Sequence, residues 1–190
     1  MRLRIAAAAA RLMSEDGIED LALAKRKAAK QLGVADTRAL PSNDEVEDEL
    51  RAYQSLYHGD EHRDRIRDLR EKALCVMQAL AKFRPYLTGA VLRGTAGRYS
   101  DIELQLFTDD SKSVELLLLS RNLPYEVIDH RRFGSGDRPV SVLKLDWEGI
   151  PVKLLICSER DERGGGSVFG ARAERAGIES VAELLRQTMQ

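Results

Sequence analysis

Two carboxylates, Asp101 and Glu103, stand two residues apart in the segment Ser100-Asp101-Ile102-Glu103-Leu104. Residues 102–107 alternate as a β-strand does, and this alternation places both carboxylates on one face of a sheet. Mg²⁺ prefers oxygen ligands and is commonly held by one or two carboxylates together with substrate phosphates. The spacing therefore predicts that Asp101 and Glu103 are metal ligands.

A turn of small residues, Gly94-Thr95-Ala96-Gly97, precedes this strand. Glycines allow backbone amides to approach a phosphate closely. In phosphoryl or nucleotidyl transfer, bound metals align the attacking and leaving oxygens and neutralise developing charge. A glycine-rich turn followed by an acidic strand therefore suits such chemistry, although plain β-turn-β connections have the same pattern.

These motifs resemble the nucleotidyltransferases of the polymerase-beta type, particularly the small bacterial members related to antibiotic adenylyltransferases. The family pattern is Gly-Ser, ten residues, then Asp-x-Asp, usually ending in Ser-Asp-Ile-Asp-Leu. Here Gly89-Ala90 stands at the Gly-Ser position, residues 91–100 form the gap, and residues 100–104 form the carboxylate strand. The pair Arg93-Gly94 also matches a common arginine-glycine pair. The resemblance covers roughly residues 70–157.

The resemblance implies a Mg²⁺-dependent enzyme that transfers a nucleoside monophosphate from an NTP to a hydroxyl acceptor. Asp101 and Glu103 would hold the metal, and Asp146 would act as a base or a third ligand. The triphosphate and its charge would be held by residues of the glycine-rich segments, namely Gly89, Ala90, Arg93, Gly94, Thr95, Arg98 and Ser100.

Three residues depart from the family pattern. Ala90 stands where the family has serine, and Glu103 stands where it has a second aspartate. The third family carboxylate usually lies on a later strand, and the matching strand here, 150–156, offers Lys153. A lysine at this position would repel a metal ion and could pair with Asp101 or Glu103. The alternative hypothesis is therefore a catalytically degenerate binding or regulatory module, in which Lys153 neutralises the acidic pair.

Hydrophobic periodicity predicts the elements that must position these residues. We expect an α+β fold, a nucleotidyltransferase-like mixed β-sheet flanked by helices and preceded by an α-helical N-terminal region. Residues 1–60 would form the helical region and 61–190 the α/β domain, with the helix 60–84 shared. The other expected helices are 3–13, 18–32, 42–57, 111–121 and 178–189. The expected strands are 87–92, 102–107, 125–128, 140–147 and 150–157, with loops at 134–137 and 163–167.

Composition narrows the choice of partners. The chain has 190 residues, of which 30 are basic and 31 acidic. This balance gives no global attraction to nucleic acid or to an anionic membrane, and no segment approaches the ~20 apolar residues of a membrane span. Lys25, Arg26, Lys27 and Lys30 form a basic helix face, and residues 31–34 resemble the turn of a DNA-reading helix-turn-helix. A DNA-binding regulator is therefore a weaker alternative, and we expect a solvated helix face instead. Self-association through the helices is a further expectation.

The remaining reactive residues receive structural interpretations. Cys75 and Cys157 lie in apolar contexts, so we expect buried free thiols and a reducing, cytoplasmic location. His58 and His62 have a spacing that could bind a metal on a helix. Gly59 predicts a helix break between them, so we expect a solvated helix start instead.

Overall fold

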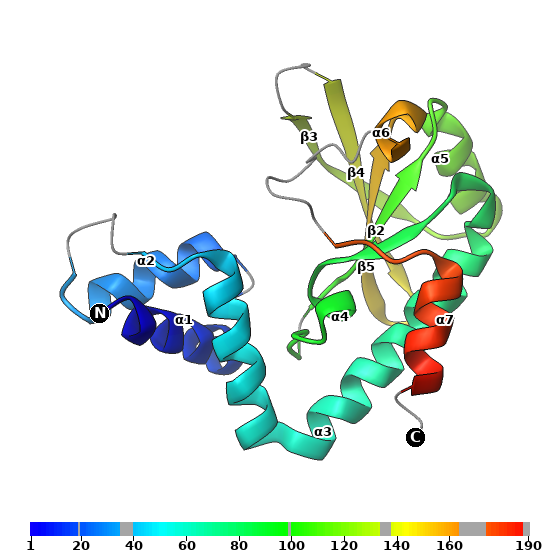
Figure 1. The fold of residues 1–190 in the computed structure, drawn as a ribbon. Helices are drawn as coiled ribbons and strands as arrows, with labels where there is room; N and C mark the ends of the chain where they lie inside the picture. The colour runs from blue at the N-terminus through cyan, green and yellow to red at the C-terminus, as the bar shows by residue number, and fades with distance from the viewer. Residues whose placement is uncertain (19, 35–39, 99, 134–137, 164–173, 188–190) are drawn as a thin grey trace. The chain divides into compact units, whose positions relative to one another are not determined.

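The computed structural model describes residues 1–18, 20–34, 40–98, 100–133, 138–163 and 174–187 (Figure 1). It confirms the α+β class, with an N-terminal helical region followed by a five-stranded mixed sheet and flanking helices. The chain forms two compact units, one of residues 1–66 with 94–100 and the other of residues 67–93 with 101–190. Two of the expected loops, at 134–137 and most of 163–167, lie outside the described residues.

The first unit is built from α1 (Arg2–Asp16), α2 (Leu21–Gln31) and the start of α3 (Asn43–Ala79). Small residues on α1 and α2 let the helices approach closely around a core of Ile5, Ala6, Ala9, Leu12, Ala24, Ala28, Ala29 and Val46. The Asp20 carboxylate accepts from the first amides of α2. The predicted capping box of α3 is confirmed, because Ser42 and Glu45 each accept from the other's backbone amide.

Helix α3 contains the predicted break, because Gly59 has non-helical dihedrals of φ 12° and ψ −100°. Its C-terminal half ends at Ala79, earlier than the predicted end at residue 84. A short 3₁₀ helix, η2 (Ala81–Phe83), follows, and Arg84 then takes a left-handed conformation with φ 49°. The side chain of Arg84 pairs with Glu159 and Glu162 of α6 (Glu159–Arg163), a helix that the sequence patterns did not predict.

The second unit contains a sheet with the strand order β1-β2-β5-β4-β3. Strands β2 and β5 are parallel and the other neighbours are antiparallel. The strands are β1 (Tyr86–Thr88), β2 (Ile102–Phe107), β3 (Tyr125–Phe133), β4 (Arg138–Trp147) and β5 (Ile150–Cys157). The remaining helices of this unit are α4 (Gly89–Arg93), α5 (Ser111–Ser120) and α7 (Ile178–Gln187). Because β4 and β5 are consecutive along the chain and pair antiparallel, the predicted hairpin is confirmed.

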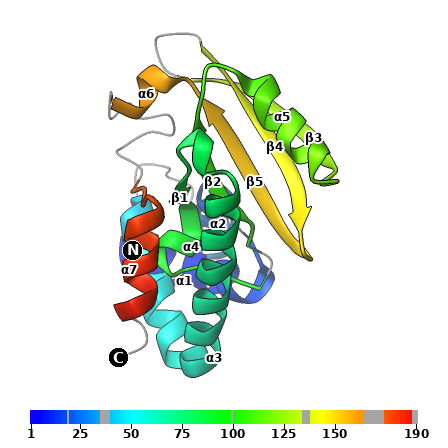
Figure 2. The same ribbon diagram turned by 90° about the vertical axis from the view of Figure 1, so that its right-hand side faces the viewer.

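The two faces of the sheet differ in polarity. One face is a buried apolar layer of Leu87, Ile102, Leu104, Leu106, Leu143, Leu145, Val152, Leu154 and Ile156. Helix α5 and the C-terminal half of α3 lie on one side of the sheet (Figures 1 and 2). The other face carries charged residues near the start of β2 and an apolar cluster of Phe107, Val142, Leu155 and Cys157 near its end. The charged part is the candidate site.

Two sequence predictions about this unit are wrong. Residues 87–92 do not form one strand, because β1 ends at Thr88 and Gly89, with φ 72°, turns the chain into α4. Short apolar runs fit a strand or a helix equally well, so periodicity alone does not distinguish them. Cys75 is exposed on α3, whereas Cys157 is buried as predicted; both are free thiols. Among the described residues, none of the helices combines the length and the apolar character that crossing a membrane requires.

Candidate functional site

A row of polar side chains crosses the sheet on the charged face. Thr88 of β1 lies opposite Glu103 of β2, Glu103 lies opposite Lys153 of β5, and Lys153 lies opposite Lys144 of β4. Residues in register on neighbouring strands share a face, so these four side chains stand side by side. Asp101, two residues before Glu103, belongs to the same face. The structure therefore brings the two predicted metal ligands together with two lysines.

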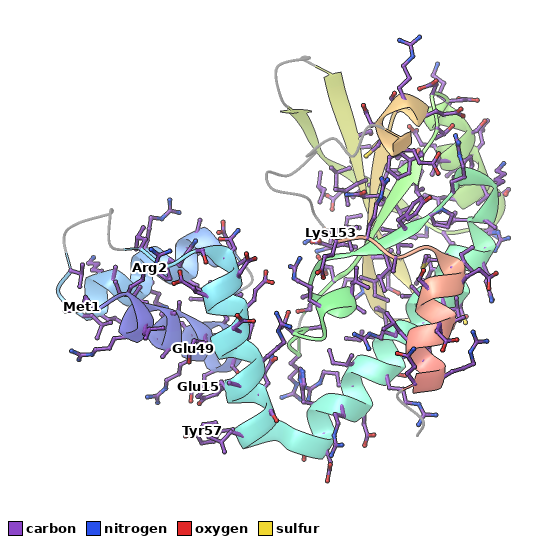
Figure 3. The ribbon with its side chains drawn as sticks, viewed as in Figure 1. Met1, Arg2, Glu15, Glu49, Tyr57 and Lys153 are labelled. Atoms are coloured by element: carbon purple, nitrogen blue, oxygen red, sulfur yellow. The ribbon has the colours of Figure 1, made fainter. Side chains whose placement is uncertain are left out.

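Lys153 makes the shortest charged contact of this group. Its Nζ lies 2.6 Å from Asp101 Oδ2 and 4.0 Å from Glu103 Oε1 (Figure 3 labels Lys153). Lys144 Nζ lies 4.0 Å from the same Asp101 oxygen. The Asp101 side chain is only 7% exposed, whereas that of Lys153 is 25% exposed. A carboxylate this buried needs a partner of opposite charge, and Lys153 supplies it. The predicted pairing of Lys153 with the acidic residues is confirmed.

The Glu103 carboxylate also packs against Gly89 at the start of α4. A Cβ added to Gly89 would lie 2.6 Å from Glu103 Oε2 and 3.2 Å from Glu103 Cδ. Gly89 has a φ of 72°, which side chains disfavour in any case. The left-handed backbone therefore favours glycine at position 89, and any side chain there would also displace the flexible end of Glu103.

Helix α4, which carries Ala90 and Arg93, is held by Arg70 of α3. The Arg70 guanidinium donates from Nε to the Val91 carbonyl at 3.1 Å and from Nη2 to the Leu92 carbonyl at 2.7 Å. These carbonyls have no partner within so short a helix, so the arginine takes the role of a C-terminal cap. Burial lowers the pKa of Arg70 from its ordinary value. Sequence reasoning missed Arg70, because nothing in its own helical pattern distinguishes it.

The small-residue turn belongs to the first unit, with Gly94, Thr95, Arg98 and Ser100. Gln54 Nε2 donates to the Thr95 carbonyl at 3.1 Å, and His62 Nε2 lies 2.8 Å from the Gly94 carbonyl. Because a carbonyl only accepts, His62 Nε2 carries the hydrogen. His62 is buried, so the predicted solvated helix start is wrong at this residue. The remaining predicted nucleotide-binding residues, Gly89, Ala90 and Arg93, belong to the second unit.

Ser100 closes the turn on itself. The Gly97 amide donates to Ser100 Oγ at 2.9 Å. An amide that already has a hydroxyl partner within the chain must exchange that partner before it can bind a phosphate oxygen. The turn is thus held by its own side chain and by two side chains of α3, which sequence spacing could not reveal.

Asp146, the predicted base or third ligand, stabilises the turn between β4 and β5. Its Oδ1 accepts from the Gly149 amide at 2.7 Å. The turn contains two left-handed residues, Glu148 with φ 53° and Gly149 with φ 85°. Asp146 lies opposite Pro151 in the sheet and is exposed. A role in closing the hairpin explains this carboxylate without a catalytic function.

The site as it stands does not fit Mg²⁺. The Lys153 ammonium lies against Asp101, and a divalent cation bound to the same oxygen would meet a positive charge at close range. Within the described part of the chain, no group of three or more histidine, cysteine, aspartate or glutamate residues could hold a metal ion. The arrangement supports a network of ion pairs within the chain, in which Lys153 and Lys144 approach Asp101 and Lys153 also approaches Glu103.

The basic face of α2 is engaged in contacts within the first unit. Lys25 Nζ donates to the Pro41 carbonyl at 3.1 Å and to Asn43 Oδ1 at 2.7 Å. Lys27 Nζ pairs with Asp16 at 3.2 Å. Lys25 and Lys27 thus have structural contacts, whereas Arg26 and Lys30 of the same face are exposed, in agreement with the expected solvated face.

Comparison with known protein families and with curated proteins finds no match for this chain.

Proposed function

We propose that this chain is a catalytically degenerate member of the polymerase-beta-type nucleotidyltransferase superfamily, which acts as a binding or regulatory module. The observation that carries the proposal is the 2.6 Å contact between Lys153 Nζ and Asp101 Oδ2. The lysine supplies from within the chain the positive charge that a metal would bring. An ammonium has a single charge and cannot coordinate several oxygens as Mg²⁺ does.

The arrangement of elements supports the family part of the proposal. A short strand leads through Gly89 into α4, the small-residue turn follows, and the acidic pair then lies at the start of β2, with Asp101 just before the strand and Glu103 within it. Strand β5, parallel to β2, places Lys153 directly opposite Glu103. A third carboxylate at position 153 would complete a group of three on this face, so the lysine stands where the resemblance expects an acid.

The proposal extends to partners and location. Self-association or contact with another protein would involve the N-terminal helices, which expose Leu3, Leu56 and Tyr57. Two free cysteines support a reducing, cytoplasmic location.

The alternative is an active Mg²⁺-dependent nucleotidyltransferase that uses an NTP and a hydroxyl acceptor. One observation favours it, because Asp101 and Glu103 share a face beside Gly89, as a metal and phosphate site requires. Catalysis would require Lys153 to leave Asp101 before a metal binds. This step distinguishes the two proposals experimentally.

The test is to exchange the lysine for the missing carboxylate. Asp101, Glu103, Lys144 and Lys153 have a formal charge sum of zero, and Lys153→Asp changes this sum to −2. We expect Mn²⁺ titrations followed by electron paramagnetic resonance to show no binding by the natural chain and binding by Lys153→Asp. Lys112→Asp, on the exposed N-terminal turn of α5, is the matched control and should bind no Mn²⁺.

Lys153→Met keeps the proposal testable if the aspartate variant does not fold. It removes the ammonium without adding a charge, and it too should bind Mn²⁺ more tightly than the natural chain. Mg²⁺-dependent binding of NTP and release of pyrophosphate by the natural chain would overturn the degenerate module in favour of the enzyme.

A further inference from the structure

The Glu103 carboxylate contacts two parts of the site with its two oxygens. Oε1 lies 4.0 Å from Lys153 Nζ, and Oε2 packs over Gly89. We infer that Glu103 excludes phosphate anions from this site, in addition to its ion pair with Lys153. The inference rests on the proposed function, because it concerns the same degenerate site.

Glu103 obstructs the space beside Gly89. A glycine beside a phosphate site leaves room for an anion to approach the backbone, which a side chain would prevent. Here that room is filled, since Glu103 Oε2 lies 2.6 Å from the position that a Cβ of Gly89 would take. The glycine therefore accommodates a carboxylate of the chain itself. An external anion would have to displace it.

The backbone holds Glu103 in this position. Glu103 lies within β2, paired with Thr88 on one side and Lys153 on the other. The Thr88 hydroxyl donates to the Glu103 carbonyl at 3.3 Å. These pairings fix the backbone of Glu103, and its side chain, which is 40% exposed, lies over Gly89.

The charges of the site also act against an anion. Asp101 and Glu103 balance Lys144 and Lys153, so the four groups sum to zero. Without the Glu103 charge these four groups sum to +1, and Glu126 of β3 stands opposite Lys144 at the far end of the row. A phosphate anion beside Gly89 meets the Glu103 carboxylate in the natural chain, and once this carboxylate is removed the charged residue in register with position 103 is Lys153. Glu103 thus places a like charge directly beside Gly89.

The experiment measures binding of inorganic pyrophosphate by calorimetry in the presence of EDTA, so that no divalent cation contributes. Glu103→Ser removes both the charge and the bulk over Gly89. The matched control is Glu126→Ser on β3, which loses the same atoms and charge at an exposed position opposite Lys144. We expect pyrophosphate to bind Glu103→Ser about tenfold or more tightly than the natural chain, because like charges at an interface are strongly unfavourable. Glu126→Ser should change the affinity by less than about twofold, because its charge stands away from Gly89.

Equal gains in the two variants, or no gain in Glu103→Ser, would overturn the inference. If Glu103→Ser does not fold, Glu103→Gln keeps the side-chain volume and should show a smaller gain in the same direction; no gain in that variant would count equally against it. The pyrophosphate experiment and the test of the proposed function can fail independently of each other. Mn²⁺ binding by the natural chain contradicts the degenerate module, whereas the pyrophosphate titrations in EDTA report on Glu103 alone.

Discussion

At the scale of single residues, the burial of Asp101 determines the character of the site. Its side chain is 7% exposed, and Lys153 and Lys144 both approach the same oxygen. A buried carboxylate without a partner is costly, so the chain gains from holding a cation here permanently. A bound metal would satisfy the same need only when metal is present. Lys153 makes the neutralisation independent of the supply of metal ions.

The two cysteines give a prediction at the same scale. Burial, helped by the negative charge of Asp161, raises the pKa of Cys157 to about 12. A raised thiol pKa means that the reactive thiolate is scarce at pH 8 and becomes common only near that pKa. Cys75 is exposed. We expect an aromatic disulfide reagent at pH 8 to modify one thiol in the folded chain and two after denaturation.

Cys75→Ser is the control for this measurement. The folded variant should show no fast reaction, and mass spectrometry of the natural chain should find the label on Cys75. Rapid labelling of Cys157 in the folded chain would contradict its burial.

At the scale of elements, the β1–α4 connection depends on Gly89. Gly89→Ala would place a Cβ 2.6 Å from Glu103 Oε2 in a left-handed backbone with φ 72°. Gly149→Ala is the matched control, because Gly149 has φ 85° and nothing within 4 Å of the added Cβ. The left-handed conformation costs both alanine variants about 1–2 kcal/mol. We expect Gly89→Ala to lower the free energy of unfolding further, by about 0.5–1.5 kcal/mol, because the Glu103 side chain must leave its place over Gly89.

Urea unfolding of both variants measures this difference. Glu103→Ser in the Gly89→Ala background should recover part of the loss, because it removes the atoms that the new Cβ meets. Equal losses in the two alanine variants would show that Glu103 moves aside without cost, and this result would also weaken the packing argument for its role.

Elements whose signals are local were predictable. The capping box of Ser42 and Glu45 marks the start of α3, and the alternation in 102–107 marks β2 with the observed bounds. Helix α4 was not predictable, because Arg70 caps it from 21 residues away and a strand fits the same apolar run. A short helix that ends on a distant side chain leaves no signature in its own sequence.

The candidate site was predictable in part for the same reason. The spacing of Asp101 and Glu103 and the lysine at position 153 are visible in the sequence, and the pairing follows from strand register. The contacts of Glu103 with Gly89 and of Gln54 and His62 with the turn require knowledge of which backbone segments meet. His62 was expected at a solvated helix start because Gly59 predicts a helix break before it, whereas in the structure His62 is buried and contacts the Gly94 carbonyl.

At the scale of the whole chain, the helical region takes in part of the motif segment. Residues 94–100 group with residues 1–66, and Thr95 and Ala96 are buried. The sequence predicted a helical region over 1–60 and an α/β domain over 61–190. In that prediction, residues 94–100 belong to the α/β domain, whereas in the structure they group with the helical region. Gln54 shows the consequence, because a boundary at residue 60 would remove the side chain that binds the Thr95 carbonyl.

A fragment of residues 67–190 tests this organisation. It lacks both Gln54 and His62, so the Gly94 and Thr95 carbonyls lose their partners, and residues 94–100 lose the unit with which they group. Proteolysis requires local opening, and its rate rises when the contacts of a segment are removed. We expect trypsin to cleave after Arg93 and Arg98 at least about tenfold faster, relative to cleavage after Arg121, in the fragment than in the full chain. The full chain with Gln54→Leu and His62→Leu should show the same direction of change while it keeps the helical region. Equal relative rates in all three proteins would mean that the turn holds its conformation without α3, and the helical region would then be an independent module.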